Sequence, residues 1–276
     1  RTLPNQTLTW QVDGTIPTDG KISWNTASAN MIHTNWVWTT DGDLNVNGSN
    51  IEVSGTVDAP FSGNIYLELP VNAIPQRHYF QTDSLNDPNH NLDFTMQVLQ
   101  VFRSDATILQ PIPDQTGEPV ALFVEITNQI LLRLENPGNG EDEFLLTAEV
   151  VESSGMSSPP VAEFTTYNPQ RTLGPLATTI ATVDVILSED TPAQEPFTLR
   201  FTWNSLGDET VSTTVDLLIE AEPDHKWDAS FSQGLNHQVT PSEIVNLDYQ
   251  VINTGNAIDD LIVKPNFELT YFGQDD

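Results

Sequence analysis

Hydrophobic and polar residues alternate with a period of two along most of the chain. The clearest run consists of Phe197, Leu199, Phe201 and Trp203, with Thr, Arg and Thr between them. Successive side chains of a β-strand point to opposite faces of its sheet, so this pattern predicts a strand with one buried face. Residues 181–187 and 94–98 alternate in the same way. Since no segment sustains the 3.6-residue period of a helix, the sequence predicts an all-β protein.

The middle of the chain contains seven such segments with turn sequences between them. These turns read Asn-Pro-Gly-Asn, Ser-Ser-Gly, Leu-Gly-Pro and Ser-Leu-Gly-Asp, and their residues are typical turn formers. Seven short strands in about 100 residues correspond to one immunoglobulin-like β-sandwich. The predicted strands are residues 119–125, 129–135, 142–151, 162–168, 177–188, 197–205 and 210–221.

Residues 1–110 predict a related but more elaborated β-sandwich. Residues 72–91 form its longest stretch without alternation, and they predict a loop excursion that offers a variable contact surface. The predicted strands of this part are residues 8–12, 21–24, 35–40, 51–57, 64–69 and 93–102.

A short motif occurs twice at an offset of 117 residues. Asn136-Pro-Gly-Asn139 follows one alternating segment, and Asn253-Thr-Gly-Asn256 follows another. The glycines, Gly138 and Gly255, are able to take a positive φ, and Asn side chains can hydrogen-bond to the local backbone. The motif therefore predicts a turn between two strands of a repeated module.

The chain resembles the CARDB-type immunoglobulin-like repeats of archaeal and bacterial surface proteins. The resemblance lies in the order of an alternating strand, Asn-x-Gly-Asn, an acidic pair and a further strand. The segment from Leu173-Gly-Pro to Ser188, followed by Pro192 and Phe197, is similar to the second half of such a repeat. The resemblance covers residues 111–276. It implies tandem extracellular modules that serve as spacers, adhesive stalks or lattice components.

The expected architecture is thus all-β, with tandem immunoglobulin-like β-sandwich modules. The predicted domains are residues 1–110, 111–222 and 223–276. The last has predicted strands at residues 226–233, 244–253, 260–264 and 267–272. It holds only about half of a repeat, so we expect the chain to continue beyond Asp276 or a neighbouring subunit to complete the module. Proline-containing junctions at residues 111–113 and at Pro223 predict an elongated string of modules.

The charge balance narrows the set of partners. The chain has 39 Asp and Glu residues against 9 Lys and Arg residues, a net charge of −30. Nucleic acid and anionic membranes are excluded because they require clustered cations. No apolar run reaches the roughly 18 residues of a membrane helix, and no Cys is present. Cations are the natural counter-partners, with a soluble acidic surface as the alternative.

Two acidic groups are candidate Ca²⁺ sites. In the first, oxygen-bearing side chains occupy alternate positions, as in a calcium loop, but neither possible register is complete, and an exposed hairpin is the alternative. The second group lies at the junction of residues 222 and 223, where it could share an ion between modules or form a solvated linker. The first group is Asp41, Asp43, Asn45, Asn47 and Glu52, and the second is Glu220, Glu222, Asp224 and Asp228.

Further residues bear on metal, catalytic or sugar chemistry. The group His78, Asp83, Asp87, His90 and Asp93 matches no metal motif. No catalytic hydrolase or phosphate-loop motif occurs, so we expect no enzyme activity. Trp36 and Trp38 share a strand face and predict either core packing or a sugar-stacking platform. Asn5-Gln-Thr7 and Asn47-Gly-Ser49 are glycosylation sequons.

These observations favour a non-catalytic structural or adhesive component of an extracellular surface assembly, such as an S-layer, stalk or filament-associated protein. Its expected partners are other copies of itself or neighbouring surface-protein modules, and glycans. The alternative is a carbohydrate-binding accessory region of an exported enzyme.

Overall fold

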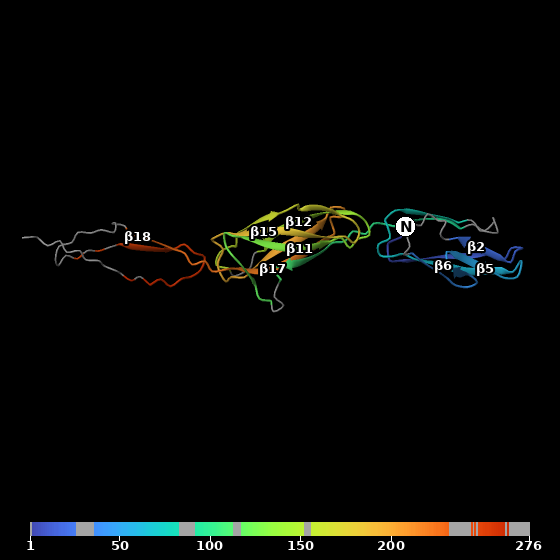
Figure 1. Ribbon diagram of the computed structural model, residues 1–276, viewed down its shortest axis with the longest axis horizontal. Coiled ribbons are helices and arrows are strands. Elements are labelled where there is room, and N and C mark those ends of the chain that lie inside the picture. The colour runs from blue at the N-terminus through green and yellow to red at the C-terminus, as the bar shows by residue number, and fades with distance from the viewer. Residues whose placement is uncertain are drawn as a thin grey trace, which may run out of the picture.

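The computed structural model describes residues 2–25, 36–82, 92–112, 117–151, 156–231, 244, 246, 248–262 and 264. Within these residues every regular element is a β-strand, as the alternating pattern predicts. No helix in this described portion is long and apolar enough to cross a membrane. The chain is therefore an all-β protein of immunoglobulin-like sandwich modules, arranged in a row along its long axis (Figure 1).

The first module contains eight of the strands in three small sheets. The orders are β1-β6-β3, β2-β5-β4 and β7-β8. Apolar side chains that alternate along these strands form two clusters: one surrounds Trp24 and Phe61, and the other surrounds Trp36 and Leu67. The strands are β1 (Thr7–Thr15), β2 (Lys21–Asn25), β3 (Val37–Thr40), β4 (Asn45–Asn47), β5 (Asn50–Ser54), β6 (Pro60–Glu68), β7 (Arg77–Thr82) and β8 (Leu92–Gln97).

The prediction of a loop over residues 72–91 is partly wrong. Strand β7 lies inside it and pairs antiparallel with β8. This strand is missed because Arg77 and His78 interrupt its start with polar side chains, although His78 is buried. Residues 83–91, including Asp83, Asp87 and His90, lie outside the described residues.

The second module is a two-layer sandwich, with sheet orders β10-β17-β16-β12-β14 and β13-β15-β11-β9. One continuous core fills the space between the sheets, and Phe144 stacks on Trp203 with ring centroids 4.8 Å apart. The strands are β9 (Asp105–Gln110), β10 (Val120–Leu122), β11 (Thr127–Glu135), β12 (Asp142–Val151), β13 (Ala162–Thr166), β14 (Gln170–Leu173), β15 (Thr178–Leu187), β16 (Phe197–Ser205) and β17 (Ser212–Ala221).

All seven strands predicted for this module are present, and two further strands complete it. Strand β14 pairs with β12 and is too short to show a period. Strand β9 pairs with β11, and its Ala106 and Ile108 pack on the second core. The structure therefore places residues 105–110 in the second sandwich, whereas the predicted boundary at residue 110 put them in the first.

The third unit contains β18 (Trp227–Phe231) and β19 (Tyr249–Asn253), which form an antiparallel pair. Both fall within predicted strands. Residues 260–262 and 264, part of a predicted strand, are described without strand structure, and the strand predicted over residues 267–272 lies outside the described residues. The expectation that this half-module is completed by further chain or by a neighbour stays a prediction.

Candidate functional site

The first predicted calcium group is divided between two sheets. Asp41 lies beside β6, where it accepts hydrogen bonds from the Asn64 backbone N–H (2.8 Å) and the Tyr66 hydroxyl (2.5 Å). The Tyr66 bond is the main cause of the lowered pKa of Asp41, and the two Asn64 bonds add to it. Asp43 accepts from the Ser62 backbone N–H at 2.9 Å. Both carboxylates thus attach the loop before β4 to strand β6.

The remaining members of this group lie on the β4–β5 hairpin. Gly48, with φ of +61°, forms its turn. Glu52 pairs with Lys21 at 2.9 Å and accepts from the Asn47 side-chain amide at 3.2 Å. Lys21 is the main cause of the lowered pKa of Glu52. The structure brings Asn47 and Glu52 together, and Asn45 occupies the same short strand β4 as Asn47.

The second predicted group follows the chain from β17 into β18. Asp224 pairs with Lys226 at 2.7 Å, and this bond is the main cause of the raised pKa of Lys226. Lys226 also reaches Glu125 at 3.4 Å. Asp228 accepts from the backbone N–H of Ala229, and Glu220 and Glu222 are half-buried.

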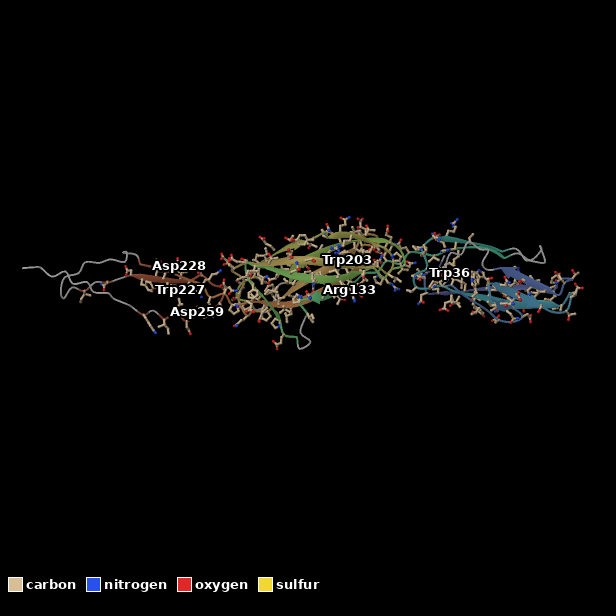
Figure 2. The ribbon with its side chains drawn as sticks, in the orientation of Figure 1. Trp36, Arg133, Trp203, Trp227, Asp228 and Asp259 are labelled. Carbon is tan, nitrogen blue, oxygen red and sulfur yellow. The ribbon has the colours of Figure 1, made fainter. Side chains whose placement is uncertain are left out.

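The two acidic groups therefore have protein donors close to many of their oxygens. In the described portion of the chain, no three His, Cys, Asp or Glu side chains are grouped so that they could hold a metal ion. Calcium binding stays a prediction that a titration must test. Figure 2 shows Asp228 and Asp259 on the third unit.

The histidine and tryptophan candidates belong to the core of the first module. His78 is 6% exposed, contacts the Ile74 carbonyl through Nε2 at 3.1 Å, and lies against Trp36 with ring centroids 4.7 Å apart. Trp36 is 7% exposed, and Trp38 packs between both clusters and against Trp10. Core packing is confirmed for Trp36, and the exposed sugar-stacking platform is wrong.

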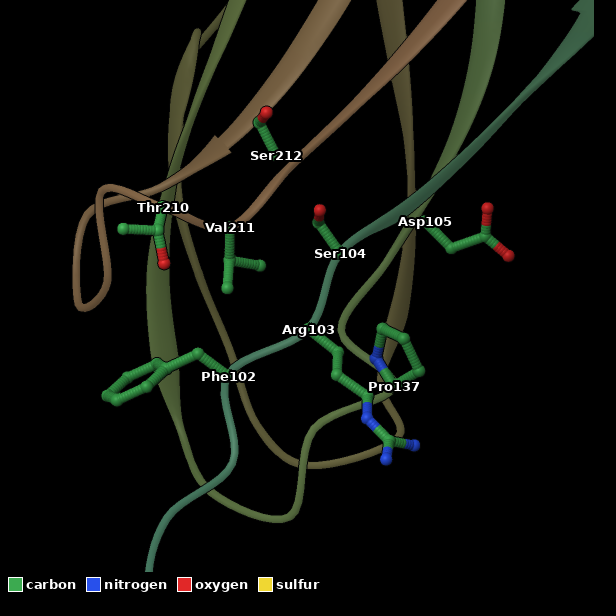
Figure 3. Close-up of a pocket in the computed structure, with 8 residues that line it drawn as sticks. All are labelled: Phe102, Arg103, Ser104, Asp105, Pro137, Thr210, Val211 and Ser212. Atoms are coloured by element: carbon green, nitrogen blue, oxygen red, sulfur yellow. The ribbon is translucent and has the colours of Figure 1, made fainter.

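One pocket in the described residues is a shallow depression of about 420 Å³ at the end of the second module, beside the linker that arrives from the first module (Figure 3). Its charged side chains are Arg103 and Asp105, and the close-up places the Arg103 side chain beside Pro137. The remaining lining residues are Phe102, Ser104, Pro137, Thr210, Val211 and Ser212. Neither a nucleophile–base pair nor a pair of carboxylates lines it, so this pocket presents no catalytic arrangement.

Polar contacts also lie at the two module junctions. At the first junction, Gln100 donates to the Glu141 carbonyl at 2.7 Å, and Thr213 donates to the Ser104 carbonyl at 2.7 Å. At the second, His225 lies 3.5 Å from Asp259, close to the Asp224–Lys226 pair. Buried Asn139 also bonds across the first junction. Sequence reasoning missed its role, although the repeated motif gave the signal.

Solved structures with some similarity to the chain include domains 4 and 5 of the S-layer protein SbsC, 11% identical over 67% of this chain and 70% of that chain, with a TM-score of 0.30. The C-terminal domain of the AgI/II polypeptide BspA of Streptococcus agalactiae is 8% identical over 79% of this chain and 94% of that chain, with a TM-score of 0.28. Native alpha-2-macroglobulin of Escherichia coli is 10% identical over 84% of this chain and 17% of that chain, with a TM-score of 0.30.

Matches to families and to curated proteins are absent. No family model matches the chain, and no curated protein matches it significantly. The CARDB-type resemblance is therefore not confirmed. With identities of 8–11% and TM-scores of 0.28–0.30, the similarity to solved structures does not assign the chain to a family.

Proposed function

We propose that this chain is a non-catalytic structural or adhesive segment of an extracellular surface assembly, such as an S-layer, a stalk or a filament-associated protein. The observation that carries the proposal is the end-to-end row of modules along the long axis of the molecule (Figure 1). A row of this kind holds two other structures apart and presents long exposed flanks, as a spacer or stalk must. The CARDB-type resemblance of residues 111–276 supports the same role.

The chemistry of the surface supports an extracellular setting. A net charge of −30 keeps such a chain soluble and separate from other acidic surfaces. Asn5 and Asn47, the acceptor positions of the two sequons, are both exposed, as glycosylation requires. Other copies of the chain, neighbouring surface modules and glycans are the partners that we propose, and divalent cations are its proposed ligands.

The location is tested on intact cells of the source organism. Antibodies raised against the 276-residue chain should label the cell exterior, and protease added to intact cells should release peptides of the chain. An internal ribosomal protein, probed in parallel, shows whether the cells have stayed closed. Labelling that requires permeabilised cells would contradict the proposal.

A further inference from the structure

Both copies of the Asn-x-Gly-Asn turn lie where one module meets the module before it. In each copy, the first Asn shapes the turn. Asn136 accepts from the Gly138 backbone N–H at 2.9 Å and donates to the Gly140 carbonyl at 2.9 Å. The corresponding bonds of Asn253, to the Gly255 N–H and the Ala257 carbonyl, measure 3.0 and 2.7 Å. The two turns therefore share one internal hydrogen-bond pattern.

The second Asn of the first copy leaves its own module. The Asn139 side-chain Oδ1 accepts from the Val101 backbone N–H at 2.7 Å. Its Nδ2 donates to the carbonyls of Ala73 (2.8 Å) and Leu99 (3.0 Å). Leu99 and Val101 belong to the segment that leaves β8, and Ala73 lies in the loop between β6 and β7. Asn139 is 1% exposed, so these bonds are shielded from water.

The second Asn of the other copy makes the corresponding three bonds. Asn256 Oδ1 accepts from the Asp224 backbone N–H at 2.7 Å, and its Nδ2 donates to the carbonyls of Thr191 and Glu222, both at 3.1 Å. Glu222 and Asp224 belong to the segment that leaves β17, and Thr191 lies in the loop between β15 and β16.

The loops contacted by the two Asn residues are equivalent. Strand β6 pairs antiparallel with β1 in the first module, and β15 pairs in the same way with β11 in the second. Each contacted loop follows that strand. The exit segments after β8 and β17 are contacted in the same way. In each segment the two bonded residues are two positions apart: Leu99 and Val101 in one, Glu222 and Asp224 in the other. Two separate junctions thus contain the same contact.

The glycine of the motif makes room for this contact. Neither Gly138 nor Gly255 has a positive φ, so the conformational reason predicted from sequence is wrong. A Cβ on Gly138 would lie 2.5 Å from the Val101 carbonyl oxygen, and a Cβ on Gly255 would collide with the Asp224 carbonyl oxygen. Only glycine lets the turn approach the exit segment this closely.

We propose that the Asn-x-Gly-Asn turn is a docking surface whose partner is the end of the preceding module, and that it fixes the orientation of one module on the next. The partner presents one N–H and two carbonyls. Among the side chains of this length, an amide alone supplies both an acceptor and donors. The same turn gives both junctions the same geometry and makes the chain a stiff row, wherever the protein is located.

Spin labels test this proposal directly, because the chain contains no Cys of its own. Labelled Gln11→Cys with Thr147→Cys spans the first junction, and Thr147→Cys with Ser230→Cys spans the second; all three positions are exposed. Pulsed electron spin resonance on the full chain should give one narrow distance for each pair. Asn139→Ala should remove the narrow distance across the first junction only, and Asn256→Ala across the second only.

Asn128→Ala is the matched control. Asn128 makes a similar set of bonds, to the Phe123 N–H and to the carbonyls of Phe123, Ile126 and Val185, but all lie within the second module. This variant should keep both narrow distances. If Asn139→Ala unfolds the second sandwich, Asn256→Ala still decides, since Asn256 is only half-buried. Narrow distances that survive in Asn256→Ala, or that are lost equally in Asn128→Ala, would overturn the proposal.

Discussion

Replacing Asn136 is expected to destabilise the second sandwich by about 3 kcal/mol. This side chain is 1% exposed, accepts from the Gly138 N–H, and donates to the carbonyls of Gly140, Leu173 and Gly174. The two amide hydrogens are shared among three carbonyls, so we count two donated hydrogen bonds and the one accepted from Gly138. Each of these three bonds contributes about 1 kcal/mol. Asn136→Ala removes all three and leaves buried backbone groups unsatisfied.

Asn136→Asp is expected to destabilise the sandwich more than Asn136→Ala does. The carboxylate keeps the acceptor for Gly138, but its second oxygen then faces the carbonyl oxygens of Gly140 and Leu173. A buried charge opposite two acceptors costs more than a missing group. The order of the two variants therefore tests the assigned direction of these hydrogen bonds.

Hydrogen exchange in increasing urea, followed by mass spectrometry of peptides from β16 and β17, measures the unfolding free energy of the second sandwich alone. Asn253→Ala, the same motif position in the third unit, is the control and should leave these peptides unchanged. A loss below about 1 kcal/mol for Asn136→Ala would refute the hydrogen-bond argument. So would a free energy of unfolding for Asn136→Asp that equals or exceeds that of Asn136→Ala.

Three further predictions concern the core, acid and calcium. Trp203→Ala, which empties a side-chain site of 0% exposure, should cost about 3–5 kcal/mol in the same urea assay; a loss near 1 kcal/mol would contradict the packing. The pKa of Asp41 is lowered in the folded protein, so the stabilisation by its carboxylate is complete above roughly pH 4 and is lost as the pH falls through the folded pKa. The difference in urea midpoint between wild type and Asp41→Asn should therefore shrink in acid. A difference that stays constant with pH would contradict this role of the carboxylate. If the acidic groups bind calcium, millimolar Ca²⁺ should raise the melting temperature above that in NaCl of equal ionic strength, and equal values would refute calcium binding.

The strands of the second module were predictable because each carries several alternating apolar residues and is bounded by turn residues. Strand β16 shows this best, with Phe197, Leu199, Phe201 and Trp203 all buried. Strand β14 has four residues and is supported by its partner β12, so no period within it could reveal it. Strand β9 belongs to the second module because it pairs with β11. The alternating pattern within a strand does not show which strand it pairs with.

The role of the motif was only half predictable. The local bonds of Asn136 follow from the tendency of Asn to cap its own turn. The bonds of Asn139 join residues 38 to 66 positions apart in the chain, and such contacts depend on how two modules meet. For the same reason, the repeat signalled that Gly138 matters but gave the wrong cause, because the nearby Val101 carbonyl is visible only in three dimensions.

Small-angle scattering of the full chain tests the central claim, that docked modules form an extended row. A compact domain of this length would have a radius of gyration of roughly 19 Å. The end-to-end arrangement predicts a value well above this and a pair-distance distribution with a long tail, typical of a rod. A radius of gyration near 19 Å, with a symmetric distribution, would show that the modules fold back on one another and would contradict the account.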